Sequence, residues 1–211
     1  MPQVQDAVNY HAMNHTLNTS LESILSLSIS DERKSLLQAL IDYIKSKREK
    51  GQPIRLNFIC THNSRRSQFS QIWAQTAADY FEIPAFCYSG GVEVTACNER
   101  TIHSLERSGF IISKHGHSNP IYFILQDKDT RPIIVFSKLY DDVINPHGNF
   151  ATIMTCSHAD ENCPFIPGAE ARIPVRYEDP KEFDDTDLES TKYDQRSQQI
   201  ASEMFYVFSR V

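Results

Sequence analysis

The stretch that decides the fold is residues 54–67, which read IRLNFICTHNSRRS. Its first part, Ile54 to Ile59, is a short apolar run of the kind that forms a buried β-strand. A polar loop follows from Cys60, and a helix is predicted from about Gln68 to Tyr80, where apolar residues recur at helical spacing. Strand, tight loop and helix in this order predict the start of a βαβ unit.

Further elements are predicted on both sides of this unit. A helix is expected over 31–50, because its leucine and isoleucine residues fall on one helical face and Gly51 follows as a stop signal. Residues 1–29 are weakly patterned and are expected to form loops or a short helix. Other strands are expected at 86–88 and 150–155, other helices at 98–108 and from Thr186 onward, and an added hairpin from the apolar runs 121–125 and 133–136.

Strands that alternate with helices predict a parallel sheet covered on both faces. The expected fold class is α/β, a three-layer αβα arrangement with a small sheet of about four parallel strands. Residues 1–50 are expected to form an N-terminal helical extension to a single domain that spans 51–211.

The composition excludes several classes of protein. The chain has 211 residues and a formal net charge of -6 at pH 7, so no basic surface for nucleic acid or anionic lipid is expected. No segment is long and apolar enough to span a membrane, and the N-terminus has no apolar signal core. The five cysteines are an odd number, which favours free thiols in a reducing cytoplasm over a disulfide framework.

The loop from Cys60 to Ser67 has the features of an anion site with a nucleophile. It lies at the carboxyl end of a strand, where open α/β sheets bind ligands, and its backbone N–H groups precede a helix N-terminus. Arg66, six residues after Cys60, offers a planar fork to a tetrahedral oxyanion, and the same positive field favours the Cys60 thiolate, to which Ser67 can donate a hydrogen bond. The candidate anion-binding residues are Thr61, His62, Asn63, Ser64, Arg65, Arg66 and Ser67.

A bare Cys-x5-Arg spacing occurs by chance, and the simplest alternative is a free cysteine followed by an ordinary polar loop. The position between a strand and a helix favours the functional interpretation.

A second thiol pair, Cys156 and Cys163, lies within the segment CSHADENCP at 156–164. Two cysteines on a loop or loose helical turn can approach disulfide distance if the segment moves, which suits thiol exchange. The alternatives are two inert buried thiols or a zinc site with His158, although the absence of a Cys-x2-Cys pair argues against zinc. No metal site is therefore predicted. Cys87 and Cys97 are expected to be plain core or loop thiols.

Asp179 directly precedes Pro180 in a predicted loop. The proline biases Asp179 toward an extended conformation, from which its carboxylate can project into a neighbouring site. The alternative is a solvated turn acid.

Together, the Cys60–Ser67 loop, the 156–164 segment and Asp179-Pro180 resemble the low-molecular-weight protein tyrosine phosphatase superfamily, and most closely its thioredoxin-coupled arsenate reductases. The three motifs occur in the family's order, and the resemblance extends from about Ile54 to the C-terminus. It implies that Cys60 is the nucleophile, Arg66 the anion clamp and Asp179 the general acid. It also implies that Cys156 attacks the cysteine–arsenic adduct and that Cys163 then takes over the disulfide for thioredoxin.

The chain departs from the family's pattern at several positions. His62 replaces the usual loop glycine, as it does in some of the reductases, and Arg65 replaces a common cysteine. Gln71 stands where many reductases carry an acid for a potassium ion, so potassium dependence does not follow from the resemblance.

Three functions remain open from the sequence. The first is arsenate reduction, with an oxyanion substrate, no tightly bound cofactor and a thioredoxin-type electron donor. The second is hydrolysis of phosphotyrosine through a phospho-Cys60 intermediate. The third is a non-catalytic redox sensor based on the thiol pair.

Overall fold

The computed structural model describes residues 13–162 and 165–211 of the chain. Its centre is a four-stranded sheet in the order β2-β1-β6-β7, in which every neighbouring pair is parallel. The strands are β1 (Ile54–Cys60), β2 (Ala85–Gly91), β6 (Phe150–Met154) and β7 (Ala169–Pro174). The predicted fold class, with its small parallel sheet and N-terminal helices, is confirmed.

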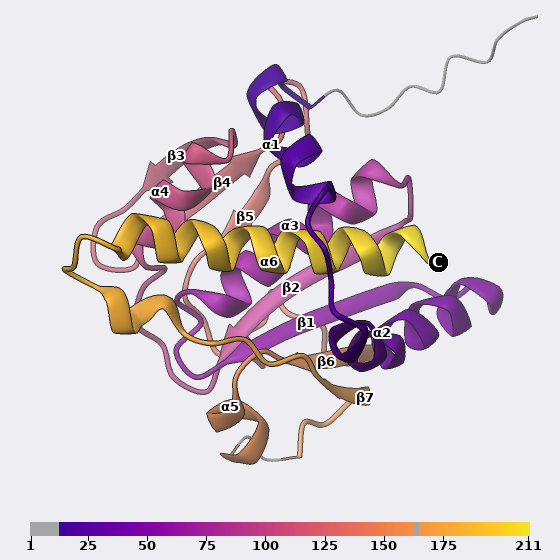
Figure 1. Cartoon of the computed structure of the whole chain (residues 1–211). Coiled ribbons are helices and arrows are strands. Elements are labelled where there is room, and N and C mark those ends of the chain that lie inside the picture. Colours follow the sequence, from indigo (N-terminus) through magenta and orange to yellow (C-terminus); the bar gives the residue numbers. More distant parts are fainter. Residues whose placement is uncertain (1–12, 163–164) are drawn as a thin grey trace, which may run out of the picture.

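The helices expected at 31–50, 68–80 and 98–108 begin and end within two residues of the predicted bounds, whereas the last helix begins at Glu189 and not at Thr186. They are α1 (His15–Leu25), α2 (Asp31–Glu49), α3 (Arg66–Tyr80), α4 (Glu99–Arg107), α5 (Ser157–Asn162) and α6 (Glu189–Ser209), with a short 3-10 helix η1 (Pro180–Phe183). The long helix α6 runs beside α3 and also contacts α1, α2 and α4 (Figure 1). The short helix α5 lies at the carboxyl ends of β1 and β6. None of the helices in the described ranges is both long and apolar enough to cross a membrane.

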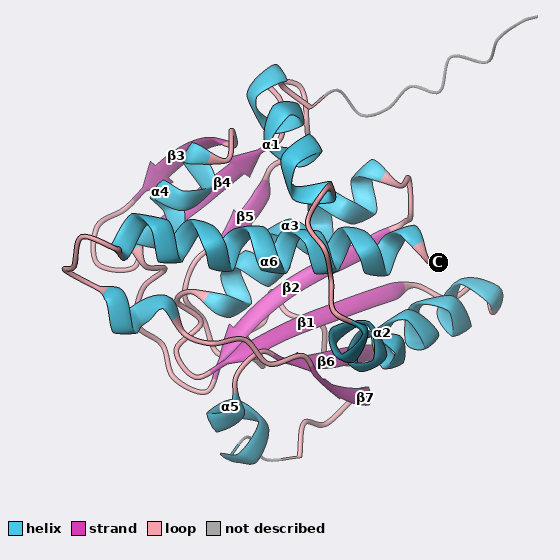
Figure 2. Ribbon diagram, in the orientation of Figure 1, coloured by secondary structure: helices cyan, strands magenta, loops and turns pink. Residues whose placement is uncertain are grey.

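A second, antiparallel sheet is separate from the first (Figure 2). It contains β3 (Ile111–His115), β4 (Ile121–Leu125) and β5 (Ile133–Val135), and the predicted hairpin is its β4–β5 pair. Two strands are absent from the sequence expectations, β3 and β7. Both carry mostly exposed or half-buried side chains, so their sequences lack the apolar signal of a core strand.

The two N-terminal helices pack into the same core as the sheet. Asn14 and Ser30 cap α1 and α2 through side chains that accept hydrogen bonds from backbone N–H groups, which explains where the helices begin. One hydrophobic cluster contains Leu17 of α1 and Leu37 of α2 together with Phe58 of β1. The helical extension is therefore continuous with the core that supports β1.

Candidate active site

The loop after β1 is held in shape by Asn63. This residue is fully buried and adopts a left-handed backbone conformation with a φ of 46°, which asparagine tolerates better than most residues. Its side-chain carbonyl accepts a hydrogen bond from the backbone N–H of Lys138 at 3.0 Å, and its own backbone carbonyl accepts one from Gln68 Nε2 at 2.8 Å. Asn63 thus ties the loop both to α3 and to the chain that follows β5.

Cys60 lies at the end of β1 with 4 % of its surface exposed. Its Sγ is 3.0 Å from the Ser67 hydroxyl, and Asn63 Nδ2 donates to that hydroxyl oxygen at 2.9 Å. Because Ser67 already accepts from Asn63, its hydroxyl hydrogen is free to point at the Cys60 sulfur. A hydrogen bond of this kind stabilises a thiolate over a thiol.

The backbone of the loop presents unused donors. Among the described residues, no backbone N–H from Thr61 to Ser67 has a hydrogen-bond acceptor. These groups include the first N–H groups of α3, whose dipole places positive potential at the same point. Consecutive free N–H groups beside a sulfur at a helix N-terminus form a binding site for an oxyanion.

The arginines at 65 and 66 both lie near Asp179 but have different hydrogen-bond partners, and Arg65 Nε is 4.0 Å from an Asp179 carboxylate oxygen. Arg66 Nη2 donates to the Asp179 carboxylate at 2.5 Å and Arg66 Nη1 to the Tyr177 carbonyl at 3.1 Å. Its Nε is buried and has no partner in the described part of the chain, which leaves one donor for an anion. Arg65 instead donates to the Tyr193 hydroxyl at 2.8 Å. Among the described residues, Arg66 thus keeps a buried donor that no protein group uses, which suits the clamp role expected for it.

Asp179 lies beside Arg66 at the start of η1, where the side chain is 28 % exposed. One carboxylate oxygen accepts from Arg66 and the other accepts from the backbone N–H of Lys181 at 3.2 Å. The residue before the proline is extended, as the sequence indicated. The Asp179 carboxylate thus lies beside Arg66 at the edge of the loop.

Cys156 follows directly after β6, the strand next to β1. Ile59 pairs with Met154, so Cys60 and Cys156 extend from neighbouring parallel strands at the same edge of the sheet. They belong to one buried cluster, and the Thr61 hydroxyl is 3.6 Å from Cys156 Sγ. The backbone N–H of Ala159 in α5 also donates to this sulfur at 3.3 Å. Cys163, the second thiol of the expected pair, lies outside the described residues.

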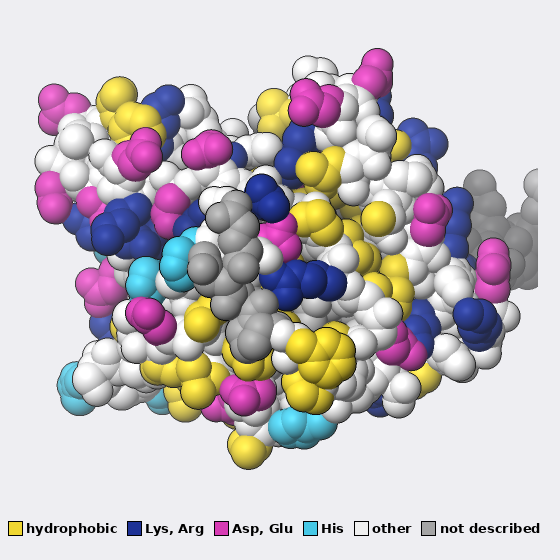
Figure 3. All heavy atoms as spheres, turned by 90° about the horizontal axis from the view of Figure 1, so that it is seen from below, with side chains coloured by type: hydrophobic (Ala, Val, Ile, Leu, Met, Phe, Trp, Pro, Cys, Tyr) yellow, Lys and Arg dark blue, Asp and Glu magenta, His cyan; other side chains and the backbone are white. Residues whose placement is uncertain are grey.

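The surface on the side of α5 is mixed in character. Arginine, lysine and histidine side chains alternate there with acidic and hydrophobic ones (Figure 3). On the rim of the Cys60 loop, His62 Nε2 is 3.4 Å from a Glu93 carboxylate oxygen, with both side chains exposed. The His62 side chain therefore lies beside an acid at the exposed edge of the loop, and it does not cover the backbone N–H groups at the base of the loop.

The remaining thiols are unsuited to nucleophilic attack. Burial raises the pKa of Cys97 to about 12 and raises the pKa of Cys87 well above its ordinary value, so both stay protonated at neutral pH. Behind the loop, burial lowers the pKa of Lys138 to about 8. Lys138 was not found from the sequence, because only the tertiary structure brings its backbone to Asn63.

Gly91, at the end of β2, is a second contributor that the sequence did not indicate. A side-chain carbon at this position would lie 2.8 Å from both the Asn63 nitrogen and the Thr61 carbonyl oxygen. The Glu93 N–H also donates to that carbonyl at 2.9 Å. The close approach of β2 sets the position of the loop, and only glycine allows it.

Gly91→Ala is therefore expected to weaken anion binding and to destabilise the fold by about 1–3 kcal/mol, because the loop backbone must move to admit the methyl group. Phosphate affinity measured by calorimetry and a denaturant unfolding curve would test both effects. Gly148→Ala is the matched control, since a side-chain carbon at Gly148 meets nothing within 4 Å. Unchanged phosphate affinity in Gly91→Ala would show that the loop does not depend on this contact.

Comparison with known proteins gives arsenate reductases among the sequence relatives. An arsenate reductase 2 of Staphylococcus epidermidis is 30 % identical over 124 residues, which cover 58 % of this chain and 76 % of that protein. An arsenate reductase of Staphylococcus aureus strain Newman is 32 % identical over 124 residues, with the same coverage of 58 % and 76 %. No family model matches the chain.

Among solved structures, a low-molecular-weight protein tyrosine phosphatase from T. tengcongensis aligns with a TM-score of 0.50 at 12 % identity. The alignment covers 75 % of this chain and 99 % of that one, and it shows a shared fold. The chain is an enzyme that belongs to the low-molecular-weight protein tyrosine phosphatase superfamily, the group that includes the arsenate reductases.

Proposed function

We propose that this enzyme reduces arsenate through a relay of Cys60, Cys156 and Cys163. The observation that carries the proposal is the location of Cys156, which lies in the same buried cluster as Cys60 and 3.6 Å from the hydroxyl of Thr61 in the anion loop. Hydrolysis of a phosphate ester needs no second thiol at this point, whereas reduction of a cysteine-bound oxyanion does. The arsenate reductases among its relatives support the same choice.

In the first step, arsenate lies in the loop between the free backbone donors and Arg66. The Cys60 thiolate attacks arsenic, and the oxygen that leaves as water takes a proton from Asp179. An oxyanion in the loop competes for the Arg66 fork, so its binding frees the Asp179 carboxyl from the ion pair that Arg66 makes with it. The candidate residues thereby act as nucleophile, clamp and acid.

In the second step, the Cys156 thiolate attacks the Cys60 sulfur. A Cys60–Cys156 disulfide forms, the sulfur–arsenic bond breaks, and its electron pair reduces arsenic from the +5 to the +3 state, which leaves as arsenite. Cys163 then attacks Cys156, and this exchange returns Cys60 as a thiolate. A thioredoxin-type dithiol reduces the Cys156–Cys163 disulfide, which places the enzyme in a reducing compartment such as the cytoplasm.

We also propose the division of the chain at about residue 50, with a helical extension before it and the reductase domain after it. The 124 residues that match the arsenate reductases leave room for such an extension, because they cover 58 % of this chain.

The second candidate is a phosphatase that acts on phosphotyrosine. It is favoured by one observation, the ion pair of 2.5 Å that holds Asp179 beside Arg66, because an acid at the edge of the loop is what the leaving phenol oxygen requires. In this case Cys60 becomes phosphorylated and water releases the phosphate.

One assay separates the two. Purified enzyme is given arsenate with thioredoxin, thioredoxin reductase and NADPH, and in parallel a phosphotyrosine peptide. We expect repeated arsenate turnover, measured as NADPH oxidation, and much slower release of phosphate from the phosphotyrosine peptide. Phosphotyrosine hydrolysis without arsenate-dependent NADPH oxidation would assign the phosphatase function instead.

A further inference from the structure

The N-terminal helix α2 reaches the segment that carries Asp179. Arg33, in its first turn, makes a two-pronged ion pair with Glu203 of α6, with Nε–Oε1 and Nη2–Oε2 distances of 2.9 and 2.6 Å. Its third nitrogen, Nη1, donates to the backbone carbonyl of Arg176 at 3.1 Å. The Glu203 side chain is only 2 % exposed and that of Arg33 is 21 % exposed, so the carboxylate of this pair is shielded from water.

Tyr177 lies between these partners. The Arg33 guanidinium is 5.1 Å from the centre of the Tyr177 ring, and the Tyr177 hydroxyl donates to Glu203 Oε2 at 2.9 Å. Burial, together with the neighbouring Glu203 carboxylate, raises the pKa of Tyr177 well above its ordinary value, so the hydroxyl remains a donor. Both the ring and the hydroxyl of Tyr177 are thus fixed by residues of α2 and α6.

The backbone of Tyr177 belongs to the active site. Its carbonyl accepts from Arg66 Nη1 at 3.1 Å, and its N–H donates to the Thr155 carbonyl, one residue before Cys156, at 3.1 Å. Asp179 follows two residues later and accepts from the other end of the same guanidinium. A displacement of Tyr177 would therefore move both the clamp and the acid.

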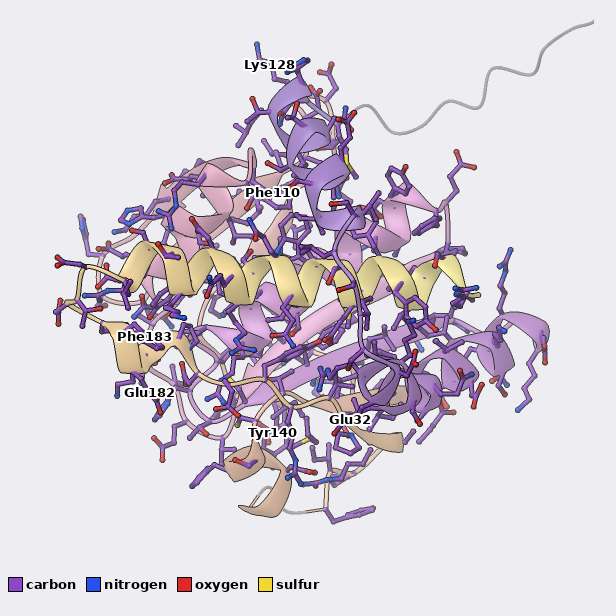
Figure 4. The ribbon with its side chains drawn as sticks, viewed as in Figure 1. Glu32, Phe110, Lys128, Tyr140, Glu182 and Phe183 are labelled. Carbon is purple, nitrogen blue, oxygen red and sulfur yellow. The ribbon has the colours of Figure 1, made fainter. Side chains whose placement is uncertain are left out.

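The far end of α2 is fixed as well. Lys47 makes an ion pair of 2.5 Å with Glu170 at the start of β7, and the Tyr43 hydroxyl donates to Glu170 at 2.9 Å. β7 leads directly into the segment that contains Arg176 and Tyr177. Figure 4 shows Glu32, the neighbour of Arg33, at the beginning of α2 beside this segment. The helix thus contacts the acid-bearing segment at its start and the preceding strand near its own C-terminal end.

We propose that α2 is part of the catalytic apparatus, with Arg33 as a positioning residue that acts through Tyr177 and Glu203 to hold Asp179 and Arg66 in place. This inference rests on the proposed function, in which Asp179 donates the proton to the leaving oxygen. A role in stability alone would leave the chemistry of a folded variant unchanged. A positioning role predicts that the effect of Arg33 on turnover depends on the presence of Asp179.

A double-mutant cycle tests this dependence. Arg33→Met should lower kcat for arsenate about 10- to 100-fold, because a small displacement of a catalytic group is costly. In an Asp179→Asn background, which has already lost the acid, the loss of kcat from Arg33→Met should be several-fold smaller, because only the displacement of Arg66 still contributes. Arg48→Met is the matched control on the same helix, since the Arg48 side chain donates to an exposed oxygen of the last residue, Val211, and it should leave kcat unchanged in both backgrounds. Equal losses from Arg33→Met in the two backgrounds would overturn the proposal.

Hydrogen exchange separates this proposal from the proposed function. In Arg33→Met, the amides of 177–184 should exchange faster, while those of β1 stay protected, and Arg48→Met should show neither change. This measurement needs no turnover, so unchanged exchange at 177–184 refutes the role of Arg33 even if the wild-type enzyme proves inactive toward arsenate. If Arg33→Met does not fold, Tyr177→Phe removes the hydroxyl contact to Glu203 and should raise exchange in the same segment. A Tyr177→Phe variant with wild-type exchange and kcat would contradict the proposal.

Discussion

Cys156→Ser is expected to release no arsenite, and Cys163→Ser to release about one equivalent per chain and then stop. Without the Cys156 thiol, the adduct on Cys60 meets no second nucleophile, so arsenic stays oxidised. Without Cys163, the first reduction still occurs, but the enzyme is trapped as a Cys60–Cys156 disulfide. Comparison of the two serine variants thus establishes which thiol attacks first.

Arsenite release in a single-turnover experiment, with mass spectrometry of the trapped protein, measures this outcome directly. Cys87→Ala serves as a control, because the pKa of Cys87 is raised by burial and its thiol takes no part in the relay. Hydrolysis of a phosphate ester needs neither Cys156 nor Cys163, so any such activity should survive in both variants. Repeated thioredoxin-coupled turnover in Cys156→Ser would rule out the relay.

Arg66→Lys is expected to lower phosphate and arsenate affinity about 10- to 100-fold, which corresponds to the ~1.5–3 kcal/mol of a charged hydrogen bond. Lysine keeps the positive charge but loses the planar fork that reaches both the Tyr177 carbonyl and the Asp179 carboxylate. Phosphate titration by calorimetry gives the affinity, and the kcat for arsenate should fall with it.

Arg65→Lys is the matched comparison, because it makes the same change one residue away. Arg65 donates to the Tyr193 hydroxyl and lies 3.4 Å from the Asp184 carboxylate. Arg65→Lys should therefore mainly lower the midpoint of thermal unfolding and change the anion affinity little. If Arg65→Lys loses anion affinity and Arg66→Lys keeps it, the clamp has been assigned to the wrong arginine.

The parts of the site that are contiguous in sequence could be predicted. The strand that ends at Cys60 and the helix that carries Arg66 follow from local apolar patterning. The free backbone N–H groups of the loop between them are expected because the first N–H groups of a helix have no partner within the helix. Cys156 was predictable for a related reason, because carboxyl ends of parallel strands meet at one edge of a sheet. The edge strand β7 was not, since its residues AEARIP alternate small and charged side chains and include a single large apolar residue, Ile173.

By itself the sequence determined the class of fold, the strand that ends at Cys60 and the helix that carries Arg66, because each depends on residues close together in the chain or on a regular pattern. Only the tertiary structure decided what supports them. Because Gly91 has no side chain, the backbone of the Cys60 loop can lie close to it. Arg33 pairs with Glu203, which is 170 positions away in the sequence. Contacts of that range arise from strand register and helix packing, where the partner of a side chain is set by the whole core and leaves no local trace in the sequence.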